Sequence, residues 1–174
     1  MIAAASVWSP WSEDDAEAEA EATDCVEDAT HLIDDEAGVC YIIPDDWALV
    51  TPEVAEEHGL ENYESTVHAP RFAATVMTTA HPYSQSETDA EESARSFVSG
   101  ITGVDYDSPS VEWVTGAVDG HDSAIAIAQL ESIWFMVTTI EDGDKMIKML
   151  GTVVSGEQEL IAQVQSIQSS VRLK

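Results

Sequence analysis

The sequence predicts an α+β protein in which an antiparallel β-sheet packs against helices. Two observations predict the sheet. Apolar segments between residues 110 and 154 are separated by Asp-Gly pairs at 119–120 and 142–143, and such pairs are typical of two-residue hairpin turns. A third observation concerns the flanks, where residues 88–100 and the segment from 155 onward repeat apolar residues at helical spacing. Antiparallel strands covered by helices define the α+β class.

The chain has 174 residues, enough for one domain and an additional arm. We assign residues 1–36 to an N-terminal acidic disordered arm and residues 37–174 to a single α+β domain. Within the arm, residues 13–21 consist of acidic residues and alanine. Such a segment offers no apolar face and its charges repel, which favours disorder or loose helix. We interpret the arm as a solvated spacer, with a cation-binding or docking tail as the alternative.

The first eight residues are apolar, and they are too few to span a bilayer. They lack the basic region of a signal peptide, yet Ala3, Ala4 and Ala5 resemble the small residues that precede a cleavage site. Two interpretations stay open: a remnant of a longer export or anchor segment, and a disordered terminus.

The first part of the domain is predicted to alternate strands with a short helix. Order is expected to begin near residue 39, where residues 39–43 are predicted to form a strand that ends at Pro44. Thr51 is a predicted N-cap, because the next residue is a proline suited to the first helical turn. Gly59 is the predicted end of this helix. Residues 71–79 are predicted to form the next strand.

Two longer helices are predicted from their caps and their apolar spacing. Thr88 and Glu91 form a capping-box pair before a helix that we expect to end at Gly100. A last helix is predicted to begin at Ser155, with Gln158 as its capping partner. Its predicted buried stripe consists of apolar residues at helical spacing, namely Leu160, Ile161, Val164 and Ile167.

The second part of the domain is predicted to be a strand meander. Strands are expected over residues 110–118, 121–130, 132–141 and 144–154. Residues 133–137 are all apolar, so both faces of the third strand are expected to be covered. This pattern is typical of a central strand.

The charge of the chain restricts its partners. The sequence contains 34 acidic residues and 6 Lys and Arg, a formal net charge of −28. DNA, RNA and anionic lipid surfaces would repel it, because binding to them depends on Lys and Arg. We therefore expect a protein partner, no nucleic acid, and no direct binding to an anionic membrane surface. We also expect a monomer.

Two explanations of the acidity stay open. One is an exported bacterial protein with an acidic spacer. The other is adaptation to high salt, in which excess carboxylate keeps a protein soluble while salt screens its self-repulsion.

The two cysteines, Cys25 and Cys40, lie fifteen positions apart and show no zinc-site spacing. They are either two free thiols or a disulfide that ties the end of the arm to the first predicted strand. We favour the disulfide, because the cysteine count is even and both residues lie near the start of the domain. A disulfide would place the protein outside the cytoplasm.

No catalytic signature is found in the sequence. The nucleophile elbow, the phosphate loop, the dinucleotide fingerprint, the HExxH zinc motif and the EF-hand loop do not occur. We therefore predict no catalytic residues, no metal site and no cofactor. The pairs Asp45-Asp46 and Asp142–Asp144 and the cluster around His121 (Asp119, Asp122) contain carboxylates, and we interpret each as an ordinary polar turn. We predict that His58 lies at a helix C-terminus, where the dipole favours a cation.

Three tryptophans are candidates for the lining of an apolar cleft. Trp47, Trp113 and Trp134 are each expected to belong to the core, as large aromatic residues usually do. If one of them were exposed beside a pocket, it would become the best site candidate.

The order of elements from residue 39 resembles the Mog1/PsbP-like fold family, and most closely the exported PsbP-like and LpqN-type proteins of Gram-positive bacteria. Residues 40–47 (CYIIPDDW) are similar to the family's opening Y-x-[IL]-P-x-x-W. Residues 119–124 resemble its G-x-P-A hairpin without the proline, and residues 167–171 resemble its closing I-x-x-S-F. The resemblance implies an α/β/α sandwich with helices packed on both faces of the sheet.

The resemblance also implies a protein that is not an enzyme, since members of this fold are mostly non-catalytic. Our leading hypothesis is an extracytoplasmic binding or assembly module, secreted or associated with the cell surface, whose ligand is unknown. The alternatives are a hydrolase-type enzyme that uses scattered Asp and His residues, and a salt-adapted intracellular adaptor. The resemblance assigns no residue of this chain to a functional site.

Overall fold

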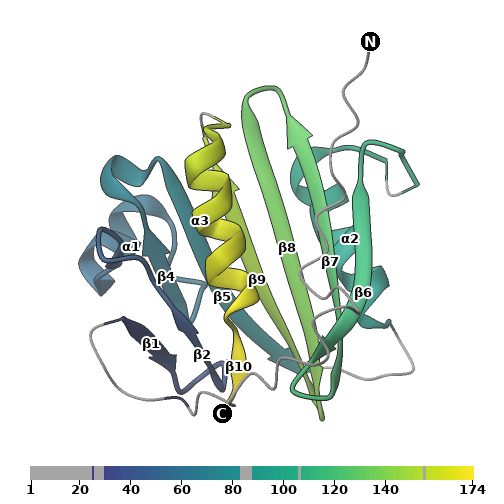
Figure 1. Cartoon of the computed structure of the whole chain (residues 1–174), viewed down its shortest axis with the longest axis horizontal. Coiled ribbons are helices and arrows are strands. Elements are labelled where there is room, and N and C mark those ends of the chain that lie inside the picture. Colours follow the sequence, from purple (N-terminus) through teal and green to yellow (C-terminus); the bar gives the residue numbers. More distant parts are fainter. Residues whose placement is uncertain (1–24, 26–29, 83–87, 106, 155) are drawn as a thin grey trace.

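The computed structural model describes residues 25, 30–82, 88–105, 107–154 and 156–174. Their main feature is an antiparallel sheet of seven strands in the order β3-β4-β5-β9-β8-β7-β6 (Figure 1). A second, three-stranded sheet has the order β1-β2-β10. The predicted arm up to residue 24, with its acidic segment, lies outside the described residues.

The predicted meander is confirmed, with small shifts at the strand ends. Its strands β6, β7, β8 and β9 span Glu112–Val118, His121–Leu130, Ile133–Asp142 and Lys145–Val153. Consecutive strands pair antiparallel, and β9 also pairs with β5 (Ala74–Pro82). Strand β8 is buried from residue 134 to residue 140, as expected of a strand covered on both faces.

The two Asp-Gly hairpins differ in their turns. Asp119 and Gly120 both have positive φ, 51° and 84°, as a type I′ turn requires. In the β8–β9 hairpin, Asp142 still pairs with Lys145, so Gly143 and Asp144 are the central residues. Of these two, only Gly143 has a positive φ, 62°. This is the pattern of a type II′ turn, in which glycine occupies the first central position.

Helix α2, Ala90–Thr102, covers one face of the large sheet against β7, β8 and β6. The predicted capping box at Thr88 is one residue early, because Asp89 is the N-cap and its side chain accepts a hydrogen bond from the backbone N–H of Glu92. The predicted end at Gly100 is also wrong. Gly100 lies exposed within the helix, and Gly103 ends it in the left-handed conformation, with φ of 68°.

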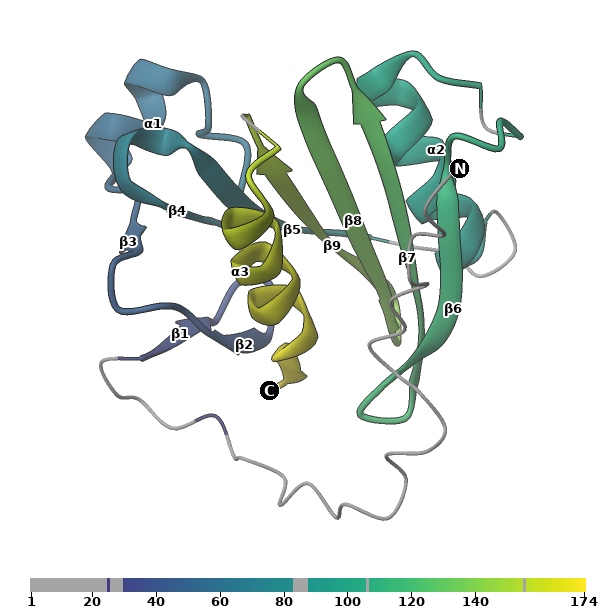
Figure 2. The same ribbon diagram turned by 45° about the horizontal axis from the view of Figure 1, so that its top comes forward.

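Helix α3, Gln158–Ser169, lies on the opposite face of the large sheet, against β9, β5 and β8 (Figures 1 and 2). Its predicted stripe is confirmed: Val164 and Ile167 are buried, and Leu160 and Ile161 pack against the core. The predicted start at Ser155 lies outside the described residues, and the N-cap is Glu157. With α2 and α3 on opposite faces, the predicted α/β/α arrangement is confirmed.

The domain begins earlier than predicted. Strand β1, His31–Asp34, lies within the segment that we assigned to the arm, and it pairs antiparallel with β2, Val39–Ile42. The arm boundary at residue 36 is therefore too late, because Leu32 packs against the core. Strand β10, Arg172–Leu173, pairs with the other side of β2. A disulfide joins Cys25 to Cys40 on β2, with their Cα atoms 5.8 Å apart.

Short elements complete the first part of the domain. Helix α1, Pro52–His58, has the predicted bounds, with Thr51 at its N-cap and Gly59 at its C-cap. Strands β3, Ala48–Leu49, and β4, Ser65–His68, extend the large sheet beyond β5. The strand predicted from residue 71 begins only at Ala74, because the 3-10 turn η2, Pro70–Phe72, precedes it.

The sheet separates two apolar clusters. The first lies on the α3 side and extends to the small sheet through Val39 and Tyr41. The second lies on the α2 side and contains Ala94, Val98 and Phe135. Among the described residues, no helix combines the length and the apolar character needed to cross a bilayer.

One polar side chain is buried between α3 and the sheet. Gln168 is 1% exposed, and its Oε1 accepts a hydrogen bond from Thr138 Oγ1 at 2.6 Å. Its Nε2 donates to the carbonyl oxygen of Met136 at 3.2 Å. These bonds fix the position of α3 against β8, since a displaced helix would leave buried polar groups unpaired.

We expect Thr138→Val to lower the free energy of unfolding by about 1–3 kcal/mol, because it leaves Gln168 Oε1 buried without a donor. Adding Gln168→Met should recover part of this loss, because both partners are then apolar. Urea denaturation of the two single variants and the double variant measures the coupling. Strictly additive effects of the two substitutions would contradict it.

Candidate functional site

An acidic cavity lies between the small sheet and the edge of the large sheet. Its volume is about 500 Å³. Strand β1, helix α1 and strands β3 and β4 supply its walls, together with the loops that connect them. Its lining residues are Leu32, Ile33, Asp34, Asp35, Glu36, Leu49, Val50, Pro52, Ala55, Leu60, Glu61, Tyr63, Glu64, Ser65 and Thr66. We call this the acidic cavity, because five of these residues are carboxylates and none is Lys, Arg or His.

Asp34 is the most buried carboxylate of the acidic cavity. The residue is 6% exposed and lies at the end of β1, where the chain turns toward β2. Oδ1 accepts a hydrogen bond from the backbone N–H of Ala37 at 2.9 Å. Gly38, with φ of 78°, donates its N–H to the carbonyl oxygen of Asp34 and closes the turn. The other carboxylate oxygen, Oδ2, is buried and has no hydrogen-bond partner among the described residues.

Glu64 brings a second such oxygen from the large sheet. Its backbone N–H donates to the carbonyl oxygen of Thr78 at 3.0 Å, which fixes the residue just before β4. Its side chain is half-buried, and its Oε2 is buried without a partner in the described part of the chain. Burying an unpaired polar atom costs about 1–3 kcal/mol, and more for a charged group. Two residues that line the acidic cavity thus each carry an unsatisfied acceptor.

Hydroxyl groups lie beneath these carboxylates. Tyr41 Oη is 3.2 Å from Ser65 Oγ and accepts a 3.5 Å hydrogen bond from Thr78 Oγ1. Burial raises the pKa of the Tyr41 phenol; the bonds to Ser65 and Thr78 oppose this shift, and the negative charge of Asp34 adds to it. Tyr41 is therefore neutral at physiological pH and does not serve as a base toward Ser65.

The raised pKa of Tyr41 has a consequence for stability. The pKa of Tyr41 is higher in the folded than in the unfolded state, so the folded state favours the protonated phenol. The contribution of Tyr41 to the free energy of unfolding is therefore complete below the ordinary pKa of 10.0 and is lost as pH rises through the folded pKa. We expect the free energy of unfolding to fall more steeply above pH 10 in the wild type than in Tyr41→Phe. Guanidinium denaturation at several alkaline pH values measures both slopes, and equal slopes would refute the assignment.

The residues around His121 do not converge. The His121 Nδ1–H donates to the carbonyl oxygen of Glu141 at 3.0 Å. Asp119 instead points to β10, where its Oδ2 accepts from the N–H of Leu173 at 2.8 Å. Asp122 lies along a separate shallow cavity of about 310 Å³ near the start of α2. Over the described residues, no group of three or more His, Cys, Asp or Glu is placed to hold a metal ion.

The other paired carboxylates lie in turns. Asp45 and Asp46 are exposed in a turn that the N–H of Trp47 closes on the carbonyl oxygen of Pro44 at 3.0 Å. Asp142 and Asp144 belong to the β8–β9 hairpin. Neither pair lines a cavity described above, so the turn interpretation agrees with the geometry.

The three candidate tryptophans differ in their exposure to solvent. Trp47 and Trp134 are 5% and 8% exposed, and Trp47 Nε1 donates to Gln163 Oε1 at 2.9 Å. Trp113 is 46% exposed, so its assignment to the core is wrong, because β6 is the edge strand of the large sheet. It borders a cavity of about 380 Å³ between β6–β7 and α3 and is therefore a second site candidate.

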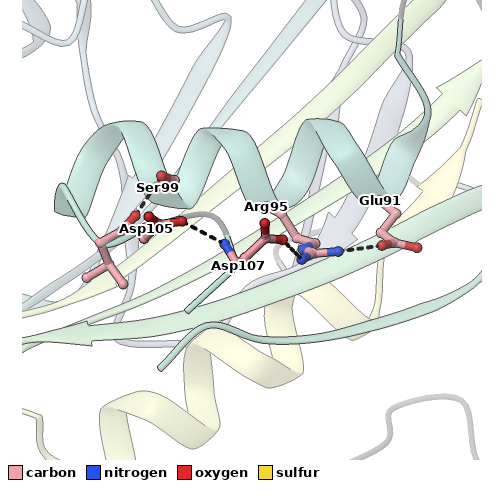
Figure 3. Close-up of polar contacts among 6 residues, drawn as sticks. Glu91, Arg95, Ser99, Asp105 and Asp107 are labelled. Carbon is pink, nitrogen blue, oxygen red and sulfur yellow. Dashed lines mark hydrogen bonds and ion pairs between the residues drawn. The ribbon is translucent and has the colours of Figure 1, made fainter. Parts of the chain in front are cut away.

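An arginine covers the ring of Trp113. The guanidinium carbon of Arg95 lies 4.7 Å from the ring centroid, within cation–π range. Arg95 lies between two carboxylates, 2.8 Å from Glu91 and 3.1 Å from Asp107 (Figure 3). Because this arrangement already satisfies the cation and covers the ring, Trp113 is a weaker candidate than the acidic cavity.

Two histidines that are ten positions apart meet at one aromatic ring. His58, at the end of α1, and His68, on β4, both stack on Phe72, with ring centroids 4.6 and 4.0 Å from that of Phe72. The His68 Nδ1–H donates to the carbonyl oxygen of Ala69 at 2.8 Å. This cluster joins α1 to the large sheet, which agrees with a structural role for His58.

The key residues of the acidic cavity were missed by the sequence analysis. Asp34 was assigned to the arm, because residues 34–36 continue its acidic composition. The apolar pair Leu32-Ile33 followed by Gly38 was the available signal for a hairpin at this point. Glu64 carries no local signal, because only the pairing of β4 with β5 places it beside the cavity.

No protein-family model matches the chain, and no curated protein matches its sequence. The structure is similar to the solution structure of the cyanobacterial PsbP protein (CyanoP) from Synechocystis sp. PCC 6803, with a TM-score of 0.59 and 10% identity. The match covers 86% of this chain and 95% of CyanoP, and it supports the predicted PsbP-like fold. At this identity the likeness concerns the fold alone. The narrower resemblance to LpqN-type proteins of Gram-positive bacteria stays a prediction.

A protein from Bacteroides thetaiotaomicron VPI-5482 is also similar, with a TM-score of 0.47 and 14% identity. The match covers 84% of this chain and 48% of that protein. A similarity of this size does not indicate a shared fold.

Proposed function

We propose that this protein is an extracytoplasmic, non-catalytic binding or assembly module that holds its ligand in the acidic cavity. One observation carries the proposal: Asp34 and Glu64, two of the residues that line the cavity, each have a buried carboxylate oxygen without a donor among the described residues. A folded protein rarely keeps such atoms unpaired unless they have a role. The likeness of the fold to CyanoP agrees with a binding role by analogy only.

The chemistry of the cavity favours binding over catalysis. Of the hydroxyl groups that line the cavity, that of Ser65 has the neutral phenol of Tyr41 as its neighbour. A serine becomes a nucleophile only when an adjacent base accepts its proton. The lining residues include no histidine that would serve as this base.

The disulfide supports an extracytoplasmic location. Cys40 is 2% exposed and lies on β2, where it joins Cys25. Structural disulfides of this kind form in oxidising compartments and are rare in the cytosol. This argument favours export over the salt-adapted intracellular adaptor.

Two measurements test the proposal. Cell fractionation of the native organism, followed by thiol titration of the denatured and unreduced protein, should find the protein outside the cytoplasm with no free thiol. Recovery of a cytoplasmic protein with two free thiols would overturn the location. Mass spectrometry of any bound ligand after incubation should show it chemically unchanged, and a converted product would overturn the non-catalytic role.

A further inference from the structure

Strand β6 is an unprotected edge of the large sheet. Among the described strands it has a neighbour, β7, on one side only, so every second residue directs its backbone N–H and C=O away from the sheet. Residues 113–118 of β6 contain no charge and no proline, and the register with β7 runs without a bulge from Glu112 to Val118. Natural proteins usually protect an edge with such features or cover it. The lack of charge is unexpected in a chain with 34 acidic residues, and it indicates that another segment covers β6.

A mainly apolar cavity lies beside β6 on the α3 face of the sheet. Helix α3 lies over β9 and β5, and β7 and β6 extend beyond it (Figure 1). The cavity has a volume of about 380 Å³, and Val114, Ile127 and Ile161 form its apolar wall. Its lining also includes one charged residue, Glu112, and three glutamines, which offer hydrogen-bond acceptors. A tryptophan side chain suits this combination, because it is a large apolar ring with a single N–H donor.

Residues 1–11 have the composition that this surface requires. They lie outside the described residues, and they contain no charged side chain, whereas residues 13–21 are acidic residues and alanine. Seven consecutive residues, 2–8, contain neither charge nor proline, and β6 also has seven residues. Trp8 and Trp11 supply two indole rings. A segment that pairs with an exposed sheet edge gains main-chain hydrogen bonds, and pockets for its side chains give specificity.

The disulfide fixes residue 25 near one end of β6. Cys25 is joined to Cys40, and Cys40 pairs with Arg172 of β10. The N–H of the next residue, Leu173, donates to Asp119 Oδ2 at 2.8 Å. Asp119 directly follows β6, so the chain that leads to residues 1–11 starts beside the strand that we expect it to cover.

The length of this linker favours residues 1–11 over other strands. The thirteen residues 12–24 can span up to about 43 Å when extended, whereas a strand of seven residues is about 24 Å long. A segment tethered by a short linker acts at an effective concentration of about millimolar. A second copy of the chain would instead bring a net charge of −28 against the same charge, and this repulsion opposes the pairing of two β6 edges.

We propose that residues 1–11 bind to the β6 edge of their own chain, with a tryptophan side chain in the cavity beside α3. The segment adds a strand to the large sheet and closes its edge against other strands. This inference goes beyond the proposed function and is independent of it, because this cavity and the acidic cavity share no lining residue.

Hydrogen exchange of the full-length protein tests the pairing, measured by NMR at two protein concentrations. We expect the outward-facing amides of β6 to exchange at least about tenfold more slowly in the wild type than in the double variant Trp8→Ala/Trp11→Ala, because a paired N–H is protected. The rates should not depend on protein concentration. The conservative variant Trp8→Phe/Trp11→Phe should keep most of the protection, since a phenyl ring still fills the cavity.

A matched pair of substitutions tests the role of the cavity. Val114→Glu places a charge in its apolar wall and should cause the same loss of protection as the loss of both tryptophans. Val154→Glu makes the same change at a valine that is 51% exposed and lies outside this cavity, and it should leave the exchange rates of β6 unchanged. If Val114→Glu does not fold, Trp8→Ala/Trp11→Ala keeps the test decisive, because its two substitutions lie outside the described domain.

Three results would overturn the inference. They are equal exchange rates of the β6 amides in the wild type and in Trp8→Ala/Trp11→Ala, protection that increases with protein concentration, and an equal loss of protection in Val154→Glu. The second result would assign the edge to another copy of the chain. None of the three concerns the acidic cavity, so failure here would leave the proposed function to its own test.

Discussion

Replacing Gly151 with alanine is expected to lower the free energy of unfolding by about 3 kcal/mol, at the upper end of the usual range for overpacked cores. Gly151 lies on β9 beneath α3 and pairs with Val76 and Met136 of the adjacent strands. A Cβ atom at this position would lie 2.3 Å from Val164 Cγ1 and 2.8 Å from Gln168 Nε2. Val164 is fully buried and branched, so it has no free space into which to turn.

The substitution would therefore push α3 away from the sheet and stretch the hydrogen bonds of Gln168. Urea denaturation measures the loss, and the same substitution at Gly100 is the matched control. Gly100 is exposed within α2, and a Cβ there would meet no atom within 4 Å. Gly100→Ala should stabilise the protein by up to about 1 kcal/mol, because alanine is the better helix former. An unchanged midpoint for Gly151→Ala would contradict the close packing of α3 on β9.

Removing the disulfide is the second large expected effect. The double variant Cys25→Ala/Cys40→Ala should lose roughly 3 kcal/mol, the value of the chain-entropy model for a loop of about 15 residues. Cys40 is 2% exposed between β1 and β10, so alanine is preferred to serine, which would bury a hydroxyl. Thermal denaturation with and without reductant measures the loss.

The control for this prediction is the reductant itself. It should destabilise the wild type by the same amount and leave the double variant unchanged. An effect of the reductant on the double variant would mean that the loss has another cause. A wild type that is insensitive to reductant would mean that the small sheet is stable without its covalent link.

Local signals explain what could be predicted from the sequence. The Asp-Gly pairs defined the hairpins because a turn with positive φ restricts residue choice at that point. The apolar stripe of α3 could likewise be predicted from the sequence, because residues on one face of a helix recur every three or four positions. The end of α2 was predicted at Gly100, although Gly103 ends it, because both glycines follow the same apolar pattern. Only the contacts of α2 with the sheet explain why the helix continues to Thr102.

Long-range pairing explains what could not be predicted. Strand β1 has only four residues and ends in an acidic one, Asp34, so its order depends on packing against β2. The acidic cavity forms where the β1–β2 hairpin lies beside β4. The residues around Asp34 and Glu64 in the sequence do not predict this long-range contact. The sequence around Gly151 predicts an ordinary strand residue. Only the position of α3 shows that a side chain would not fit there.

The small sheet joins the two extremes of the domain. Arg172 pairs with Cys40, and the N–H of Lys174 donates to the carbonyl oxygen of Gly38 at 2.9 Å. Contacts this distant in sequence form late, because a long loop must close first. During synthesis, one side of β2 therefore has no partner strand until residues 172 and 173 have been made. The β1–β2 hairpin that carries Asp34 is local, but its second strand is completed only by β10, so a chain that ended before residue 172 would leave one side of β2 unpaired.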